Sequence, residues 1–133
     1  MSAQPRESAS LSMLRMPPNA ADAEQSVLGG LMLAPEKIES LASKLVPTDF
    51  YQRRHQMIFK AMLELSARGE PCDAVTLGDW FDSNGLGEIS GGLAYCADLA
   101  NTVPSAANVS AYAQIVREKS VLRQVIDKAT ELA

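Results

Sequence analysis

The only histidine, His55, has the side chain best suited to act as an acid, a base or a metal ligand. It belongs to a stripe at helical spacing that is otherwise apolar or aromatic: Tyr51, His55, Ile58, Met62 and Leu65. A metal site would need further converging ligands, and a Ser–His or Cys–His pair would need an orienting acid. Because the sequence offers neither, we predict a core histidine with one satisfied hydrogen bond.

The remaining candidates for chemistry indicate structural roles. Asp22, Asp49 and Asp73 each stand where a helix is expected to begin, and negative charge is favourable there, so we interpret them as capping residues. The pair Gly29-Gly30 interrupts a helical pattern, either to let another backbone approach or to cradle a ligand. No G-x-x-x-x-G-K-[ST] motif for phosphate binding is present. We therefore predict no catalytic residue, no cofactor site and no metal site.

The composition favours a globular domain that does not hold nucleic acid. The 133 residues are 47% hydrophobic, and 16 acidic against 12 basic residues give a net charge of −4. Domains that bind a nucleic-acid backbone normally carry a basic surplus. Cys72 and Cys96 form no CxxC pair and are typical of buried residues in a reducing compartment. No signal peptide and no run of about 18 apolar residues is present, so we expect a cytoplasmic protein without a membrane segment.

Helical periodicity, caps and breakers predict an all-α fold, a compact bundle of about six helices. We expect a flexible tail over residues 1–16, a globular head over 17–106 and one long C-terminal helix over 107–133. No run alternates with period 2 for long enough to be a strand. Within the head, helices are expected at about 20–33 (capped by Asn19), 35–45, 50–68, 74–84 and 91–103, with a turn at 85–89.

The last helix carries more apolar surface than one contact requires. Ile115, Leu122, Ile126, Ala129 and Ala133 share one side, which we expect to dock the helix on the head. A second apolar strip beside it consists of Val121, Val125 and Leu132. So broad a face predicts a partner surface here, for another copy of the chain, a missing segment or another protein.

Three blocks of sequence stand in a fixed order between residues 17 and 133. They are PPNAADAEQSVLGGLML, DFYQRRHQMIFKAMLELSARGEPCDAVTL and ISGGLAYCADLANTVPSAANVSAYAQIVREKSVLRQVI. Together they resemble the N-terminal domain of the bacterial DnaB-type hexameric replicative DNA helicase. That domain is all-helical, in agreement with the fold class predicted above.

The resemblance implies a non-catalytic interaction module. In that family the N-terminal domains pair into a collar on a hexameric ring, and the ATPase motor lies in a C-terminal domain. The collar recruits primase through the C-terminal helical domain of primase, and a helicase loader is left open as a further partner. Because the chain ends at Ala133, inside the family's helical hairpin, we expect a fragment that neither hydrolyses ATP nor unwinds DNA.

A docking function would use exposed apolar or aromatic side chains with a polar rim. The candidate partner-binding residues are Asp22, Tyr95, Val125, Ile126 and Leu132. Each has a structural alternative, since Tyr95 and Ile126 could be core residues and Asp22 a cap. For Gly29-Gly30 we predict close packing of the first helix, against the third.

Two other classes of protein are alternatives to this interpretation. A free-standing helical DNA-binding or regulatory protein would need a basic recognition helix, which the net charge and the scattered basic residues argue against. A small enzyme would need a nucleophile–base pair or a metal cluster.

Overall fold

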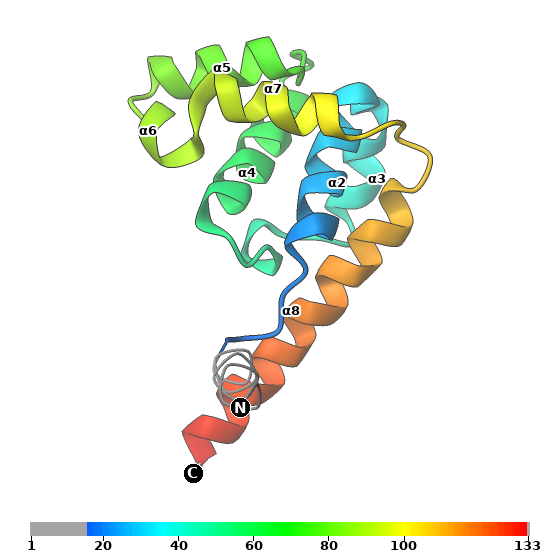
Figure 1. Cartoon of the computed structure of the whole chain (residues 1–133), viewed down its shortest axis with the longest axis vertical. Coiled ribbons are helices and arrows are strands. Elements are labelled where there is room, and N and C mark those ends of the chain that lie inside the picture. Colours follow the sequence, from blue (N-terminus) through cyan, green and yellow to red (C-terminus); the bar gives the residue numbers. More distant parts are fainter. Residues whose placement is uncertain (1–15, 133) are drawn as a thin grey trace, which may run out of the picture.

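Helix α2, Ala21–Leu33, lies at the centre of the fold because it is buried on almost every side. It packs against α4 (Arg53–Ala67), α7 (Gly92–Thr102) and α8 (Val109–Leu132). The computed structural model describes residues 16–132, so most of the predicted tail lies outside the described residues. Figure 1 shows α2 between these helices, with α8 running out of the head toward the C-terminus.

The other elements are shorter and close the head around α2. They are the 3₁₀ helices η1 (Pro35–Lys37) and η2 (Pro47–Asp49), and the α-helices α3 (Ile38–Ala42), α5 (Ala74–Ser83) and α6 (Gly87–Ser90). The helices α5, α6 and α7 form one end of the head (Figure 1). Every regular element of the described residues is helical, so the all-α prediction is confirmed.

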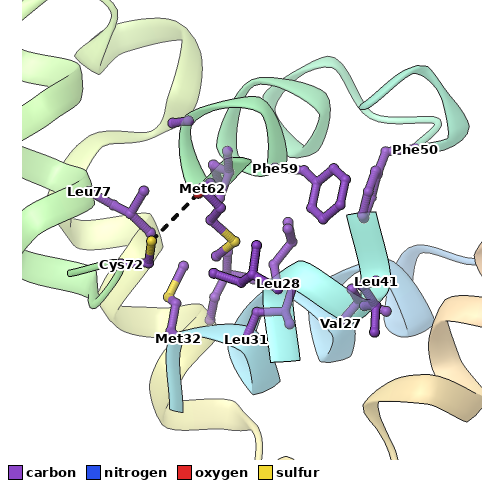
Figure 2. Close-up of a cluster of buried hydrophobic side chains, with 14 of the residues drawn as sticks. Val27, Leu28, Leu31, Met32, Leu41, Phe50, Phe59, Met62, Cys72 and Leu77 are labelled. Atoms are coloured by element: carbon purple, nitrogen blue, oxygen red, sulfur yellow. Dashed lines mark hydrogen bonds between the residues drawn. The ribbon is translucent and has the colours of Figure 1, made fainter. Parts of the chain in front are cut away.

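The core is aliphatic and sulfur-rich, with one aromatic pair. Helix α2 contributes Val27, Leu28, Leu31 and Met32, which face Met62 and Phe59 of α4 in Figure 2. The rings of Phe50 and Phe59 lie 5.1 Å apart. Each fully buried side chain of this size contributes about 1.5–3 kcal/mol to folding. Helix α2 therefore supplies one side of this core.

The prediction that Asp73 caps a helix is confirmed. The carboxylate of Asp73 accepts a hydrogen bond from the backbone N–H of Thr76 at 2.7 Å and so caps α5. Gly69 and Gly85 follow α4 and α5 with positive φ angles of 71° and 69°, as expected after a helix end.

Other local predictions were wrong. Asn19 does not cap α2; its amide donates to the Pro17 carbonyl, and no side chain caps that helix. The predicted helix at 35–45 is split into η1 and the five residues of α3, and Ala42 is exposed. The third helix begins at Arg53 because Phe50 keeps extended backbone while its ring enters the core. The turn expected at 85–89 contains the short helix α6.

Gly29 and Gly30 do allow close packing, but against α7 and α8 rather than α4. A Cβ on Gly29 would lie inside van der Waals contact of the Leu99 carbonyl oxygen and 2.6 Å from Cγ2 of Val103. A Cβ on Gly30 would overlap Cγ2 of Val109. The two glycines therefore bring three helices together, and this closeness offsets their poor helix propensity.

Candidate partner-binding surface

Helix α8 presents a broad apolar surface to solvent, most of it along the second half of the helix. At about 100° per residue, its large apolar side chains span an arc of about 140°. The members of this apolar arc are Ile115, Val121, Leu122, Val125, Ile126 and Leu132, all of them exposed. The exposed fractions of Val125, Ile126 and Leu132 are 59%, 49% and 90%. Three of the predicted partner-binding residues therefore lie on one accessible surface.

The opposite side of α8 is the side that docks on the head. Its buried residues are Val109, Ala113, Val116 and Ser120. The prediction that Ile115, Leu122, Ile126 and Ala129 dock the helix is wrong, because these residues are exposed. The fifth predicted member, Ala133, lies outside the described residues. Both sides of the helix contain aliphatic residues, so periodicity alone could not tell which one meets the head.

A polar cluster continues this docked side where the apolar contacts end. The carboxylate of Asp49, which is 1% exposed, accepts hydrogen bonds from Arg117 Nη1 at 2.8 Å and Ser120 Oγ at 2.7 Å. Arg123 donates to the Asp49 carbonyl at 2.6 Å and to the Pro18 carbonyl at 2.8 Å. Asp49 does not cap α4 as predicted; it holds α8.

Tyr95 lies on α7 in a half-buried position rather than as a free apolar anchor. Its hydroxyl is 2.5 Å from Nε2 of His55, and the two rings stack with centroids 5.8 Å apart. The guanidinium carbon of Arg54 lies 3.7 Å from the centroid of the Tyr95 ring. The hydroxyl of Tyr95 is thus held by His55, and its ring contacts both the imidazole of His55 and the guanidinium of Arg54.

His55 is fully buried and hydrogen-bonded at both ring nitrogens, not one. Nδ1 lies 2.7 Å from Oε1 of Glu24, a carboxylate that is itself 1% exposed. The orienting acid that sequence analysis could not find is therefore Glu24. The signal was weak, because Glu24 reads as one more acidic residue in the first turn of α2.

The predicted partner-binding residues do not form one cluster. Asp22 is exposed in the first turn of α2, Tyr95 lies on α7, and Val125, Ile126 and Leu132 lie on α8. Only the α8 residues share an element and a face.

No group of three or more His, Cys, Asp or Glu side chains within residues 16–132 is arranged to hold a metal ion. Among the same residues, no helix combines the length and apolarity needed to span a membrane.

Both thiols are free and buried, as predicted. Burial raises the pKa of the Cys96 thiol to about 11. Burial, followed by the charges of Asp73 and Glu70, also raises the pKa of Cys72. Such thiols are poor nucleophiles at neutral pH, because the thiolate is the reactive form.

The described residues thus form a helical head from which one long helix projects with an exposed apolar side. The sequence model of the DnaB-like helicase N-terminal domain matches residues 16–118. The replicative DNA helicase DnaC of Bacillus subtilis is 47% identical over 119 residues, which are 90% of this chain and 26% of that protein. The chain thus spans about a quarter of the length of the curated relatives it matches.

Solved structures agree with the sequence match. The N-terminal domain of the DnaB helicase from Mycobacterium tuberculosis superposes with a TM-score of 0.83 at 45% identity, covering 87% of this chain and 84% of that one. The corresponding domain from Helicobacter pylori, described with its interactions with primase, has a TM-score of 0.70 at 24% identity, covering 83% and 85%. This chain belongs to the family of DnaB-like helicase N-terminal domains.

Family membership confirms the resemblance seen in the three sequence blocks. The matched region is the N-terminal domain of a DnaB-like helicase. Membership of this family supports the interpretation as a helicase domain over the alternative of a free-standing DNA-binding or regulatory protein.

Proposed function

We propose that this domain acts in DNA replication by supporting assembly of the helicase oligomer and by docking primase. The observation that carries the proposal is the apolar arc of α8. Six large apolar side chains face solvent on one helix whose opposite side is already docked. Exposed apolar surfaces of this kind mark sites where another protein binds.

The occupant that we propose for the apolar arc is a second copy of the domain. The arc continues to the end of the described helix, and the side chain nearest that end, Leu132, is the most exposed of the six. Pairing two such arms along their length would bury the arcs against each other, as in other helix pairs with apolar seams.

Sedimentation velocity over a concentration series tests this assignment. The wild-type domain should associate reversibly, and the double variant Val125→Asp, Ile126→Asp should stay monomeric, since each substitution would bury a charge in the seam. Thr130→Asp adds a charge to the same exposed stretch outside the arc and serves as the matched control. A double variant that associates as strongly as the control would refute the proposal.

Primase docking is the second part of the proposal, and it is based on the comparison with a solved structure. The Helicobacter pylori domain with the same fold is described with its interactions with primase. For this chain we propose the C-terminal helical domain of the cognate primase as partner. A calorimetric titration with the folded wild-type domain should give saturable heat, and no heat would contradict docking by the domain alone.

The remaining partner proposals follow from the family and the charge. A helicase loader is a further candidate partner, testable by the same titration. With a net charge of −4, the domain itself is proposed not to hold DNA. As a domain of a replication protein it is proposed to act in the cytoplasm.

A further inference from the structure

Helix α8 is held to the head by two different kinds of contact along its length. The first part is docked by the buried apolar side chains of Val109, Ala113 and Val116. From Arg117 onward α8 contacts the head through the polar side chains of Arg117, Ser120 and Arg123, and beyond Arg123 every described side chain is exposed. The helix leaves the head in this region (Figure 1).

The polar contacts converge on one residue, Asp49 of η2. Its Oδ1 accepts from Arg117 and Ser120, its Oδ2 accepts from the Val46 N–H at 2.9 Å, and its carbonyl accepts from Arg123. The side chain of Asp49 is 2% exposed, whereas that of Arg117 is 47% exposed. The carboxylate is therefore the buried centre of the cluster, and the helix supplies its donors.

Such a cluster constrains direction more than apolar packing does. Hydrogen bonds to an ionised group are short and directional, and the guanidinium donors of arginine have a fixed planar geometry. Apolar contacts between helices tolerate sliding and rotation more readily because they are not directional. The donors Arg117, Ser120 and Arg123 are separated by two successive three-residue steps, so together they span more than one turn of α8.

We infer that Asp49 is a positioning residue that sets the direction in which α8 leaves the head. Arg117, Ser120 and Arg123 form with it a polar clasp, defined by these four residues. Because the apolar arc lies on the opposite side of the helix, the clasp also aims the arc away from the head. That consequence for assembly rests on the proposed function, whereas the direction of the helix does not.

The direction can be measured as a distance within one chain. Spin labels at Lys60→Cys on α4 and Lys128→Cys on α8 occupy exposed positions, and the native Cys72 and Cys96 are buried. Double electron–electron resonance on labelled chains diluted into excess unlabelled chains reports only intramolecular distances. The unmodified clasp should give one narrow distance distribution.

Three substitutions in this labelled background test the inference. Arg123→Met keeps an aliphatic stem but removes the hydrogen bonds to Asp49 and Pro18, and Asp49→Asn removes the charge that Arg117 and Ser120 share. In both variants the mean distance should shift or the width of the distribution should at least double. Circular dichroism should show unchanged helicity. Lys119→Met removes a cation of α8 that makes none of these contacts, and should leave the distribution unchanged.

The outcomes separate this inference from the proposed function. Distributions with both the wild-type mean distance and the wild-type width in the two clasp variants would overturn the inference and assign the direction to Val109, Ala113 and Val116 alone. Equal broadening in Lys119→Met would overturn it as well. If Asp49→Asn fails to fold, Arg123→Met alone decides. Self-association is read separately by sedimentation, so its failure would leave the measured direction intact.

Discussion

The carboxylate of Glu24 and the imidazole of His55 lie 2.7 Å apart, and both side chains are buried. Glu24 also accepts hydrogen bonds from the backbone N–H groups of Tyr51 at 2.7 Å and Gln52 at 3.4 Å. These N–H groups immediately precede α4, so a carboxylate of α2 accepts hydrogen bonds from the backbone at the start of another helix. An ionised carboxylate only accepts hydrogen bonds, so Nδ1 donates to Glu24; in a neutral imidazole, Nε2 then accepts from the Tyr95 hydroxyl.

Removal of this carboxylate should be costly. Glu24→Ala would leave His55 and the Tyr51 N–H without their partner in the core, and we expect a loss of about 3 kcal/mol in the free energy of unfolding. Urea denaturation measures it. Asp22→Ala, an exposed acid in the same turn, is the matched control and should lose less than about 0.5 kcal/mol. Equal losses in the two variants would show that the buried pair adds nothing.

Tyr95 offers a test that separates packing from docking. Tyr95→Phe keeps the ring against His55 and Arg54 but leaves Nε2 of His55 without its partner, so we expect a loss of about 1 kcal/mol and unchanged primase binding. Tyr95→Ala removes the ring and should weaken primase binding at least tenfold, measured by calorimetry on folded protein. Primase affinity that stays at the wild-type level in the folded Ala variant would remove Tyr95 from the docking surface.

The helical glycines should not tolerate a methyl group, although alanine favours isolated helices. Gly29→Ala would place Cβ against the backbone of Leu99, which cannot turn away, and we expect a loss of about 2–3 kcal/mol by thermal or urea unfolding. Gly30→Ala meets a side-chain methyl of Val109 instead, so Val109→Ala should partly rescue it. Ser26→Ala in the same helix should be nearly neutral. An additive double mutant would contradict the direct contact.

The cap of α5 should depend on pH. Hydrogen bonds from the backbone and side chain of Thr76 hold the pKa of Asp73 below its usual value of 3.8. As pH falls, the unfolded chain takes up this proton first, so the stabilisation is present above about pH 4 and is lost as pH drops further. Asp73→Ala should cost about 1 kcal/mol at pH 7 and less at pH 3.

Asp73→Asn is the matched control for that titration. Asparagine caps a helix nearly as well as aspartate but does not ionise, so its stability relative to wild type should improve as pH falls. Urea unfolding at pH 7 and pH 3 gives both differences. A difference between wild type and Asp73→Ala that grows at pH 3 would contradict the sign.

The thiols should be protected in the folded domain. Because burial raises the pKa of Cys96 to about 11 and also raises that of Cys72, iodoacetamide at pH 8 should modify neither residue within hours. Both should react in guanidinium chloride, and an exposed Ser43→Cys thiol should react in native protein. The unfolded thiols lose their protons first as pH rises through 9.0, so stability should decline above that pH. Rapid native modification would mean that this part of the core opens.

Local sequence signals predicted much of the fold. Asp73 marks the start of a helix because a cap acts through neighbours a few positions away. The prediction of one helix at 35–45 was wrong, because residues 43 and 44 form a turn. In the segment 38–45, the apolar side chains of Ile38, Leu41 and Leu45 are buried in the core. Gly29-Gly30 signalled close packing, but not which helices would approach.

The sequence by itself determined the helical class, the family and the presence of more apolar surface on the last helix than docking requires. Only the tertiary structure decided which side of α8 meets the head, because Val109, Ala113 and Val116 are as compatible with burial as the residues of the apolar arc. It also decided the roles of Glu24 and Asp49. Their partners lie 31 and 71 positions away, at His55 and Ser120, and a pairing over such distances depends on how the helices pack.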